Sequence, residues 1–304
     1  MTELCSTAAL QRGEPLAGTA SRVSRWLLVE QPGPWGPPSV PTARMPTAAA
    51  RALIAAAAAA GARLLLLRRP GRPGTAVAGR RVFVVDSRAG HERLLGTVAA
   101  GDEALAALAQ ALPFEGPVPA IWTTLSEPLL LVCTHGRHDR CCAVRGRPVA
   151  QELARHRPDR TWECSHTGGD RFAANLLVVP HGLYFGQLTP SQAVDVVRAH
   201  EDGRVVVEHL RGRSSRPTPV QAAERFARAE FGRDRLEDLV PVAQQAAGPD
   251  RWTVRLAGSG APAVEVTVRY DRDIPPVLLT CGAAEPRAAA QFRCEALEVL
   301  DGST

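Results

Sequence analysis

Short apolar segments of strand length alternate with segments of helix length along the first two thirds of the chain, and this order restricts the possible folds more than any other feature. The first segments expected to be strands are 25–30, 63–68, 82–86 and 92–98. Residues 47–60 are alanine-rich and hold no helix breaker, and alanine has the highest helix propensity. Residues 102–112 form a second expected helix. This order predicts one small α/β unit.

The same order of elements recurs in the next part of the chain. The expected elements are a strand at 128–133, a helix at 147–155, a strand at 161–165, a hairpin of 175–179 and 183–187, and a helix at 190–200. The repeat lies in the order of the elements and not in residue identity. We therefore predict two related α/β modules in tandem, at residues 22–122 and 123–211, preceded by a flexible tail at 1–21.

The last third of the chain has a different pattern. A polar stretch with prolines and serines, 212–219, is interpreted as a linker. An amphipathic helix at 220–231 and partly alternating segments at 252–256, 263–270, 277–281 and 292–300 follow it. Residues 212–304 are therefore expected to form a linker and a small α+β segment without chemistry of its own. Cys281 and Cys294 are interpreted as buried structural cysteines of that segment.

Charge and hydropathy argue against nucleic-acid and membrane partners. All 36 basic residues are arginines, the net charge is only +5, and no basic stripe is interleaved with aromatic residues. The most apolar stretch, 48–67, is interrupted by Arg51, Gly61 and Arg63, and is a poor membrane span. No apolar run follows a basic patch near the start, so we expect a cytoplasmic protein. Clustered cysteines in a reducing compartment indicate metal or redox chemistry.

Reactive side chains concentrate between residues 133 and 173. Cys133 and Cys142 are nine positions apart directly after an expected strand, and a loop of that length can bring two thiolates around one metal centre. His166 and Asp170 are four positions apart, with two glycines between them. Glycine allows a tight bend without a Cβ clash, and such a bend can point both side chains at one site.

The two segments together supply a pair of sulfurs and a nitrogen/oxygen pair. Zinc accepts two thiolates, one imidazole and one carboxylate. A [2Fe–2S] cluster also accepts mixed ligands, as Rieske centres do with two cysteines and two histidines. The spacings match neither the paired C-x-x-C knuckles of a zinc ribbon nor a plant-type ferredoxin. The residues alone therefore leave zinc and iron–sulfur open.

The same segments resemble the sucrase/ferredoxin-like family, whose members look like thioredoxin-fold [2Fe–2S] proteins. The resemblance rests on Cys-Thr-His-Gly at 133–136, on the Asp139 to Cys142 end of that loop, and on Ser-His-Thr-Gly-Gly at 165–169 followed by Arg-Phe-Ala at 171–173. Val-Glu-Gln-Pro-Gly-Pro-Trp-Gly at 29–36 is similar to bacterial members. The resemblance implies two tandem thioredoxin-like modules, the second of which binds the cluster.

In family members of that kind, two cysteines of the first motif and two histidines of the second hold the cluster. Carried over by position, the resemblance implies Cys133, Cys142 and His166 as ligands. The fourth position is Asp170, where those members have histidine. Three interpretations stay open: Asp170 ligates an iron, Cys164 completes the set, or the chain holds no cluster.

The preferred hypothesis is a soluble electron carrier, and not a substrate-converting enzyme, with a [2Fe–2S] cluster on Cys133, Cys142, His166 and Asp170. It would exchange single electrons with an unidentified redox protein. One alternative is a thiol oxidoreductase that uses Cys133, Cys141, Cys142 or Cys164. Another is a cluster-free or zinc-bound interaction domain.

Overall fold

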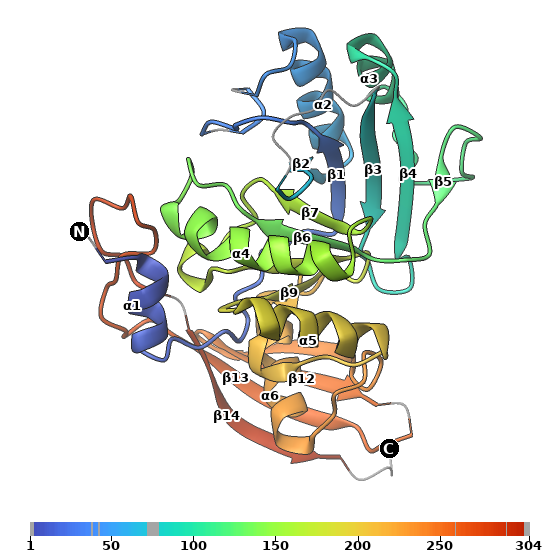
Figure 1. Cartoon of the computed structure of the whole chain (residues 1–304). Helices are drawn as coiled ribbons and strands as arrows, with labels where there is room; N and C mark the ends of the chain where they lie inside the picture. The colour runs from blue at the N-terminus through green and yellow to red at the C-terminus, as the bar shows by residue number, and fades with distance from the viewer. Residues whose placement is uncertain are drawn as a thin grey trace.

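The computed structural model describes residues 3–37, 39–41, 43–71, 79–258, 260–289 and 291–300. Within these residues, ten strands form one curled sheet in the order β10-β9-β8-β6-β7-β2-β1-β3-β4-β5, and four more strands form a separate antiparallel sheet (Figure 1). The predicted mixed α/β fold is confirmed. No helix of the described part of the chain is long and apolar enough to cross a membrane.

The first half of the large sheet is built from the first expected α/β unit. Its elements are β1 (Arg25–Glu30), α2 (Thr47–Ala59), β2 (Ala62–Arg68), β3 (Arg80–Asp86), β4 (Arg93–Ala99), α3 (Asp102–Leu108) and the short β5 (Thr123–Thr124). Strand β1 pairs with β2 in parallel and with β3 antiparallel, and β4 pairs antiparallel with β3. Across the sheet, these four strands therefore lie in the order β2-β1-β3-β4.

The second half repeats this arrangement. Its elements are β6 (Leu129–Cys133), α4 (Arg140–His156), β7 (Thr161–Cys164), the 3-10 turn η1 (Asp170–Phe172), β8 (Leu176–Val179), β9 (Leu183–Phe185), α5 (Pro190–Glu201), the 3-10 turn η2 (Val207–His209) and β10 (Leu210–Arg213). Strand β6 is parallel to β7 and antiparallel to β8, which pairs antiparallel with β9. The halves join through antiparallel pairing of β2 with β7.

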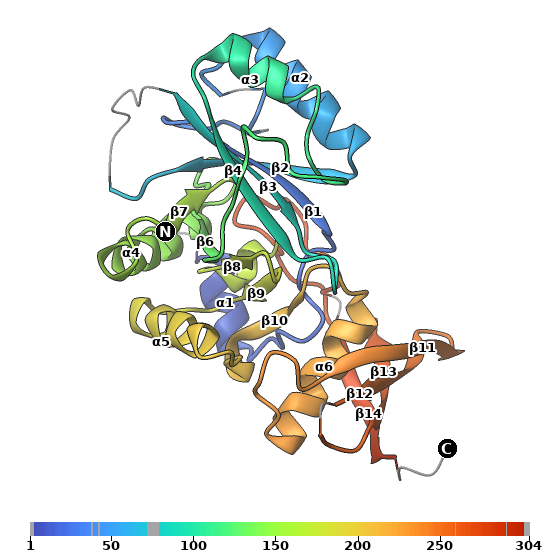
Figure 2. The ribbon, with the colours of Figure 1, turned by 90° about the vertical axis from the view of Figure 1, so that its right-hand side faces the viewer.

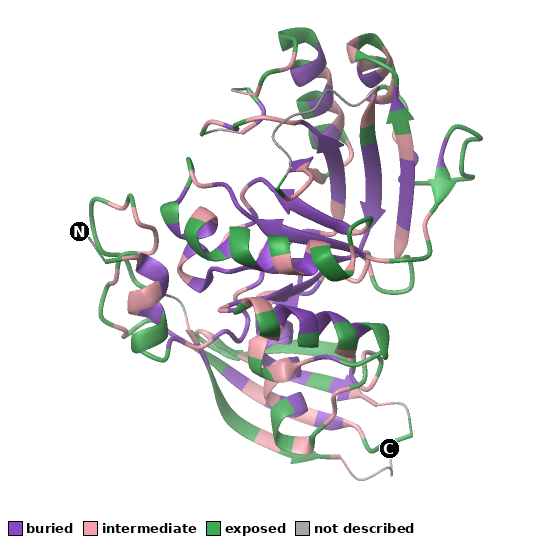
Figure 3. Cartoon of the chain, viewed as in Figure 1, coloured by how far each residue is buried: buried purple, intermediate pink, exposed green. Residues whose placement is uncertain are grey.

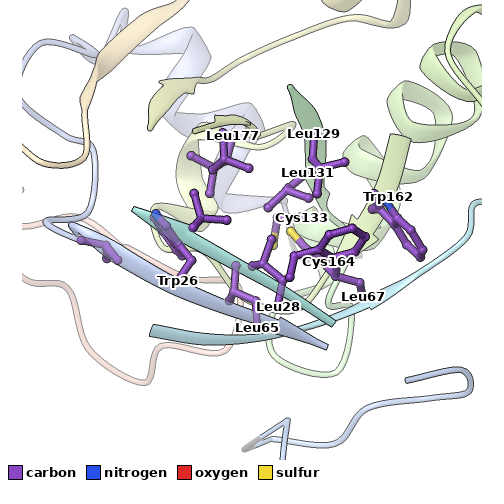
Figure 4. Packing of buried hydrophobic residues seen from close by; sticks show 14 of the residues in the cluster. Trp26, Leu28, Leu65, Leu67, Leu129, Leu131, Cys133, Trp162, Cys164 and Leu177 are labelled. Atoms are coloured by element: carbon purple, nitrogen blue, oxygen red, sulfur yellow. The ribbon is translucent and has the colours of Figure 1, made fainter. Parts of the chain in front are cut away.

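Both faces of the central strands of the large sheet are covered, which explains why strands such as β1, β6 and β8 are continuous apolar runs. Helices α2 and α3 cover one face of the first half, and α4 and α5 cover one face of the second half (Figure 2). The opposite faces of the two halves share one apolar cluster, in which Trp26 and Leu28 of β1 join Leu129 and Leu131 of β6 (Figure 4). These central strands are accordingly buried, while the edge strand β5 and the outer faces of the helices are exposed (Figure 3).

The N-terminal segment differs from the flexible tail expected at residues 1–21. Helix α1 (Cys5–Gln11) packs against η1, and Glu14 forms an ion pair with Arg171 of that turn. Cys5 and Glu14 are buried. The segment is ordered because it covers the loop that carries Asp170, a long-range contact that no local pattern encodes.

The linker expected at 212–219 is also different in the structure. Strand β10 (Leu210–Arg213) is the edge of the large sheet, and helix α6 starts at Thr218 (Thr218–Phe231). Ser214 and Arg216, between them, are buried. The polar composition of this stretch suggested that it is exposed to solvent, but its buried arginines have hydrogen-bonding partners inside the protein.

The C-terminal sheet packs on α6 and contains one strand that the sequence pattern missed. Its strands are β11 (Val240–Gly248), β12 (Arg251–Ala257), β13 (Val264–Asp271) and β14 (Gln291–Val299). Residues 277–281, expected to be a strand, form only an isolated bridge between Val277 and Arg287. The interpretation of Cys281 and Cys294 as buried was wrong, since Cys281 is half-buried and Cys294 is exposed.

Candidate metal centre

The first reactive segment is the turn between β6 and α4. Cys133 ends β6, and Cys142 lies in the first turn of α4, which begins at Arg140. The carboxylate of Asp139 caps this helix, since its Oδ1 accepts a hydrogen bond from the Cys141 backbone N–H at 2.7 Å. Such a cap satisfies a backbone donor that the first turn leaves without a partner. The helix therefore starts seven residues earlier than the expected 147–155, and it brings Cys142 back to the end of β6.

Close packing of α4 on β6 depends on Gly146. A Cβ on this residue would lie 2.2 Å from the carbonyl oxygen of Cys133 and 3.3 Å from Thr134 Cγ2. The clash with the Cys133 oxygen cannot be relieved by a side-chain movement, because this oxygen belongs to the backbone. Gly146 therefore sets the distance between the helix that carries Cys142 and the strand that carries Cys133.

We expect Gly146→Ala to lower the free energy of unfolding by about 1–3 kcal/mol, the usual cost of overpacking a dense site. It should also weaken the binding of a metal ion between Cys133 and Cys142, because α4 must shift away from Cys133. Urea denaturation and metal analysis of the purified variant test both effects. Gly101→Ala is the matched control, since a Cβ there meets nothing within 4 Å. Equal stability and metal content in the two variants would refute the role of Gly146.

The second reactive segment is the loop between β7 and β8. Gly168 and Gly169 adopt the left-handed conformation with φ of +98° and +79°, as the predicted tight bend requires. A Cβ on Gly169 would also collide with the guanidinium of Arg211. The bend brings His166 and Asp170 together, with His166 Nδ1 3.1 Å from Asp170 Oδ1.

The two segments meet at Asp170. Its Oδ1 accepts a hydrogen bond from the Cys142 thiol at 3.1 Å, and its Oδ2 lies 3.6 Å from His138 Nε2. The donor atoms of Cys133, Cys142 and His166 lie within 4.8 Å of one another, as do those of His138, His166 and Asp170. These groups could hold a metal ion.

Charges inside the site are unequally distributed. Hydrogen bonds from Cys142, His166 and the His135 backbone lower the pKa of Cys133 well below its usual value despite burial. The hydrogen bond with Cys133 and burial raise the pKa of Cys142. Burial lowers the pKa of His166, but hydrogen bonds with Asp170 and Cys133 outweigh it and raise the pKa to about 9. Against burial, the contact with His166 lowers the pKa of Asp170.

Cys164 lies beside Cys133, on the neighbouring strand. It pairs with Cys133 across the parallel strands β6 and β7, and it is buried in the shared apolar cluster (Figure 4). Burial raises its pKa well above the usual value. Among the described residues, Cys164 belongs to no group of three donor atoms that lie within 4.8 Å of one another. The geometry therefore gives no support to Cys164 as the fourth ligand.

Sequence reasoning missed two residues that shape the site. His138 stacks on His166 with ring centroids 3.6 Å apart, a contact that the spacing of the motif did not predict. Arg211 is fully buried and donates hydrogen bonds to Thr19, to the Gly168 carbonyl at 3.0 Å and to Asn175 Oδ1 at 2.8 Å. No local signal distinguishes Arg211 from the other arginines of the chain.

Comparison with known proteins covers the part of the chain that holds the candidate site. The family model described as sucrase/ferredoxin-like matches residues 16–212, which include both reactive segments. Altered inheritance of mitochondria protein 32 of Candida glabrata is 28% identical over 102 residues, which cover 29% of this chain and 33% of that protein. The chain thus spans about a third of the length of this relative. No solved structure matches. The extent of the family match shows that the chain belongs to the sucrase/ferredoxin-like family.

Proposed function

We propose that the protein carries single electrons through a [2Fe–2S] cluster held by Cys133, Cys142, His166 and Asp170. The observation that carries the proposal is the meeting of two donor pairs from two segments. The β6–α4 turn supplies two sulfurs, and the β7–β8 loop supplies a nitrogen and an oxygen. A two-iron cluster takes two protein ligands on each iron, and mixed sulfur and nitrogen ligation has a precedent in Rieske centres.

The strand order supports the further proposal that both halves are thioredoxin-like modules. In each half, a parallel β-α-β unit is followed by two antiparallel strands. The order across the sheet is β2-β1-β3-β4 in the first half and β7-β6-β8-β9 in the second. The candidate ligands lie in the second half alone. The first half packs against it through the shared apolar cluster and excludes water from the far side of Cys133.

The mixture of donor atoms suits a redox-active metal centre, because the charge of the ligands sets its reduction potential. A cluster would supply reversible one-electron chemistry. A neutral imidazole ligand raises the reduction potential relative to an all-cysteine cluster, and a carboxylate in place of the second histidine restores negative charge and lowers it. Because Cys142 and His166 hold protons in the free site, metal binding releases protons and strengthens as pH rises.

Anaerobic purification, iron and sulfide quantification, and EPR after reduction test the proposal. We expect two irons and two sulfides per chain in the wild type and loss of both in Cys142→Ser. Asp170→His should keep the cluster and raise its potential, because a neutral ligand replaces a carboxylate. Cys294→Ser is the matched control, since Cys294 is exposed in the C-terminal sheet. A colourless, iron-free protein after cluster reconstitution would refute electron transfer by this site.

One observation favours a second candidate, a zinc-bound interaction domain. Cys142 Sγ and His166 Nδ1 both lie 3.1 Å from Asp170 Oδ1, a spacing that suits ligands of a single ion. The same metal analysis separates the candidates, because this one yields zinc without sulfide.

A thiol oxidoreductase is the least supported candidate. A reactive cysteine needs partial exposure, and Cys133, Cys141, Cys142 and Cys164 are all buried. We therefore keep the assignment of an electron carrier whose donor and acceptor are other redox proteins. The reducing cytoplasm, the location expected from the sequence, would keep these thiols available as ligands.

A further inference from the structure

Three cysteines from distant parts of the chain meet beside the first turn of α4. Cys5 opens α1, Cys141 lies in α4, and Cys281 lies in the loop between β13 and β14, which runs beside α1 in Figure 1. Cys141 Sγ lies 3.4 Å from Cys5 Sγ and 3.1 Å from Cys281 Sγ. The sulfurs of Cys5 and Cys281 are 3.7 Å apart, so the three thiols form a closed triangle.

A carboxylate completes this group. Asp139 Oδ2 lies 3.9 Å from Cys5 Sγ and accepts a hydrogen bond from the Cys281 backbone N–H at 2.6 Å. A carboxylate oxygen has a second lone pair, which stays available for a metal ion. The donor atoms of all four residues lie within 4.8 Å of one another, and three of the four residues are buried.

We propose that Cys5, Cys141, Cys281 and Asp139 bind one zinc ion, at a site separate from the one formed by Cys133, Cys142, His166 and Asp170. Tetrahedral zinc with Zn–S bonds of about 2.3 Å places two thiolate ligands about 3.8 Å apart. The 3.7 Å between Cys5 and Cys281 agrees with this value, whereas the two shorter distances, 3.4 and 3.1 Å, require Cys141 Sγ to move outward by about half an ångström when the ion binds. Four protein donors leave no open position. A closed site of this kind is structural and not catalytic.

Two features favour an ion over a disulfide. A disulfide joins two sulfurs at about 2.05 Å and would leave the third thiol and the carboxylate beside it unused. Backbone amides also point at the sulfurs, since Ser6 N–H donates to Cys141 Sγ at 3.4 Å and Cys5 N–H donates to Cys281 Sγ at 3.5 Å. Such N–H···S contacts stabilise thiolate ligands of a metal.

The ion would tie three parts of the protein together. Cys5 and Cys281 lie outside the family match at 16–212, and Cys141 lies inside it. One bound ion therefore links α1 and the β13–β14 loop to the helix that carries Cys142. The gain in stability comes from closing long chain segments, and it depends on the metal that is bound.

Metal analysis of the purified full-length chain tests the proposal in a Cys133→Ser background, which removes one thiolate ligand of the first site; the comparison with and without Cys281 then reports the second site alone. We expect one zinc per chain in this background and loss of zinc after the further change Cys281→Ser. Cys294→Ser, in the same C-terminal part, should keep the zinc. Cobalt(II) alone, added to the metal-free protein, should give a thiolate charge-transfer band that Cys281→Ser abolishes.

Thermal unfolding separates metal loss from misfolding. A zinc chelator should lower the melting temperature of the Cys133→Ser protein and leave that of Cys133→Ser/Cys281→Ser unchanged, with circular dichroism as the check on folding. If Cys133→Ser/Cys281→Ser does not fold, the effect of the chelator and the cobalt band of the Cys133→Ser protein still show whether the second site binds a metal ion. A folded parent protein that binds neither zinc nor cobalt would overturn the proposal. So would an intact mass lower by two hydrogens, if peptide mapping assigns the disulfide to two of Cys5, Cys141 and Cys281.

Discussion

Arg211→Met is expected to lower the free energy of unfolding by about 3 kcal/mol. This assumes a cost of ~1 kcal/mol for each of three oxygen atoms that would lose their hydrogen-bond donor. The acceptors are the carbonyl of Thr19, the carbonyl of Gly168 and Oδ1 of Asn175. Burial lowers the pKa of Arg211 only to about 10, so its guanidinium is charged at neutral pH. Because the guanidinium holds the bend before Asp170, the variant should also lose metal from the first site.

Urea denaturation and metal analysis measure the two effects of Arg211→Met. Arg198→Met is the matched control, because Arg198 is exposed on α5. Its stability and metal content should equal those of the wild type. If Arg211→Met lost stability but kept its full metal content, Arg211 would be a core residue without influence on the ligands.

Glu224→Ala is expected to lower the free energy of unfolding by about 3–5 kcal/mol, the cost of breaking a buried ion pair. Glu224 lies inside α6 between two buried arginines. Its carboxylate pairs with Arg216, and Arg228 donates to its Oε1 from Nε at 3.1 Å and from a terminal nitrogen at 2.9 Å. Removing the carboxylate leaves two buried positive charges without a counter-ion, under the C-terminal sheet.

Urea denaturation followed by tryptophan fluorescence measures this loss, since Trp252 lies in β12 of the C-terminal sheet. Glu230→Ala, on an exposed position of the same helix, controls for the change in helix propensity. Glu224→Gln should lie between the two, because it keeps the volume and one acceptor. Equal midpoints for Glu224→Ala and Glu230→Ala would show that the buried network contributes nothing to stability.

Local sequence patterns predicted the elements whose side chains are uniformly buried. The continuous apolar run of β1 (Arg25–Glu30) is found where it was expected, because a strand covered on both faces carries its signal in every residue. Strand β11 (Val240–Gly248) was missed because it is almost entirely exposed and shows no alternation. The start of α4 was missed because its cysteine- and arginine-rich first turns, capped by Asp139, resemble a reactive loop.

The spacing along the chain predicted which candidate ligands of the first site lie close together within each pair. Cys133 and Cys142 belong to one turn, and His166 and Asp170 belong to one bend, so short spacings already place each pair together. The meeting of the two pairs follows from the parallel pairing of β6 with β7, which sets the two segments side by side at the same edge of the sheet.

The sequence by itself predicted the mixed α/β fold, the family and the two candidate donor pairs, because each depends on residues close together in the chain. Only the tertiary structure decided that ten strands form one curled sheet and that Arg211 holds the second bend. It also brought together Cys5, Cys141 and Cys281, whose contacts span 136, 140 and 276 positions. Contacts of that range arise from the packing of whole elements, and no local periodicity records them.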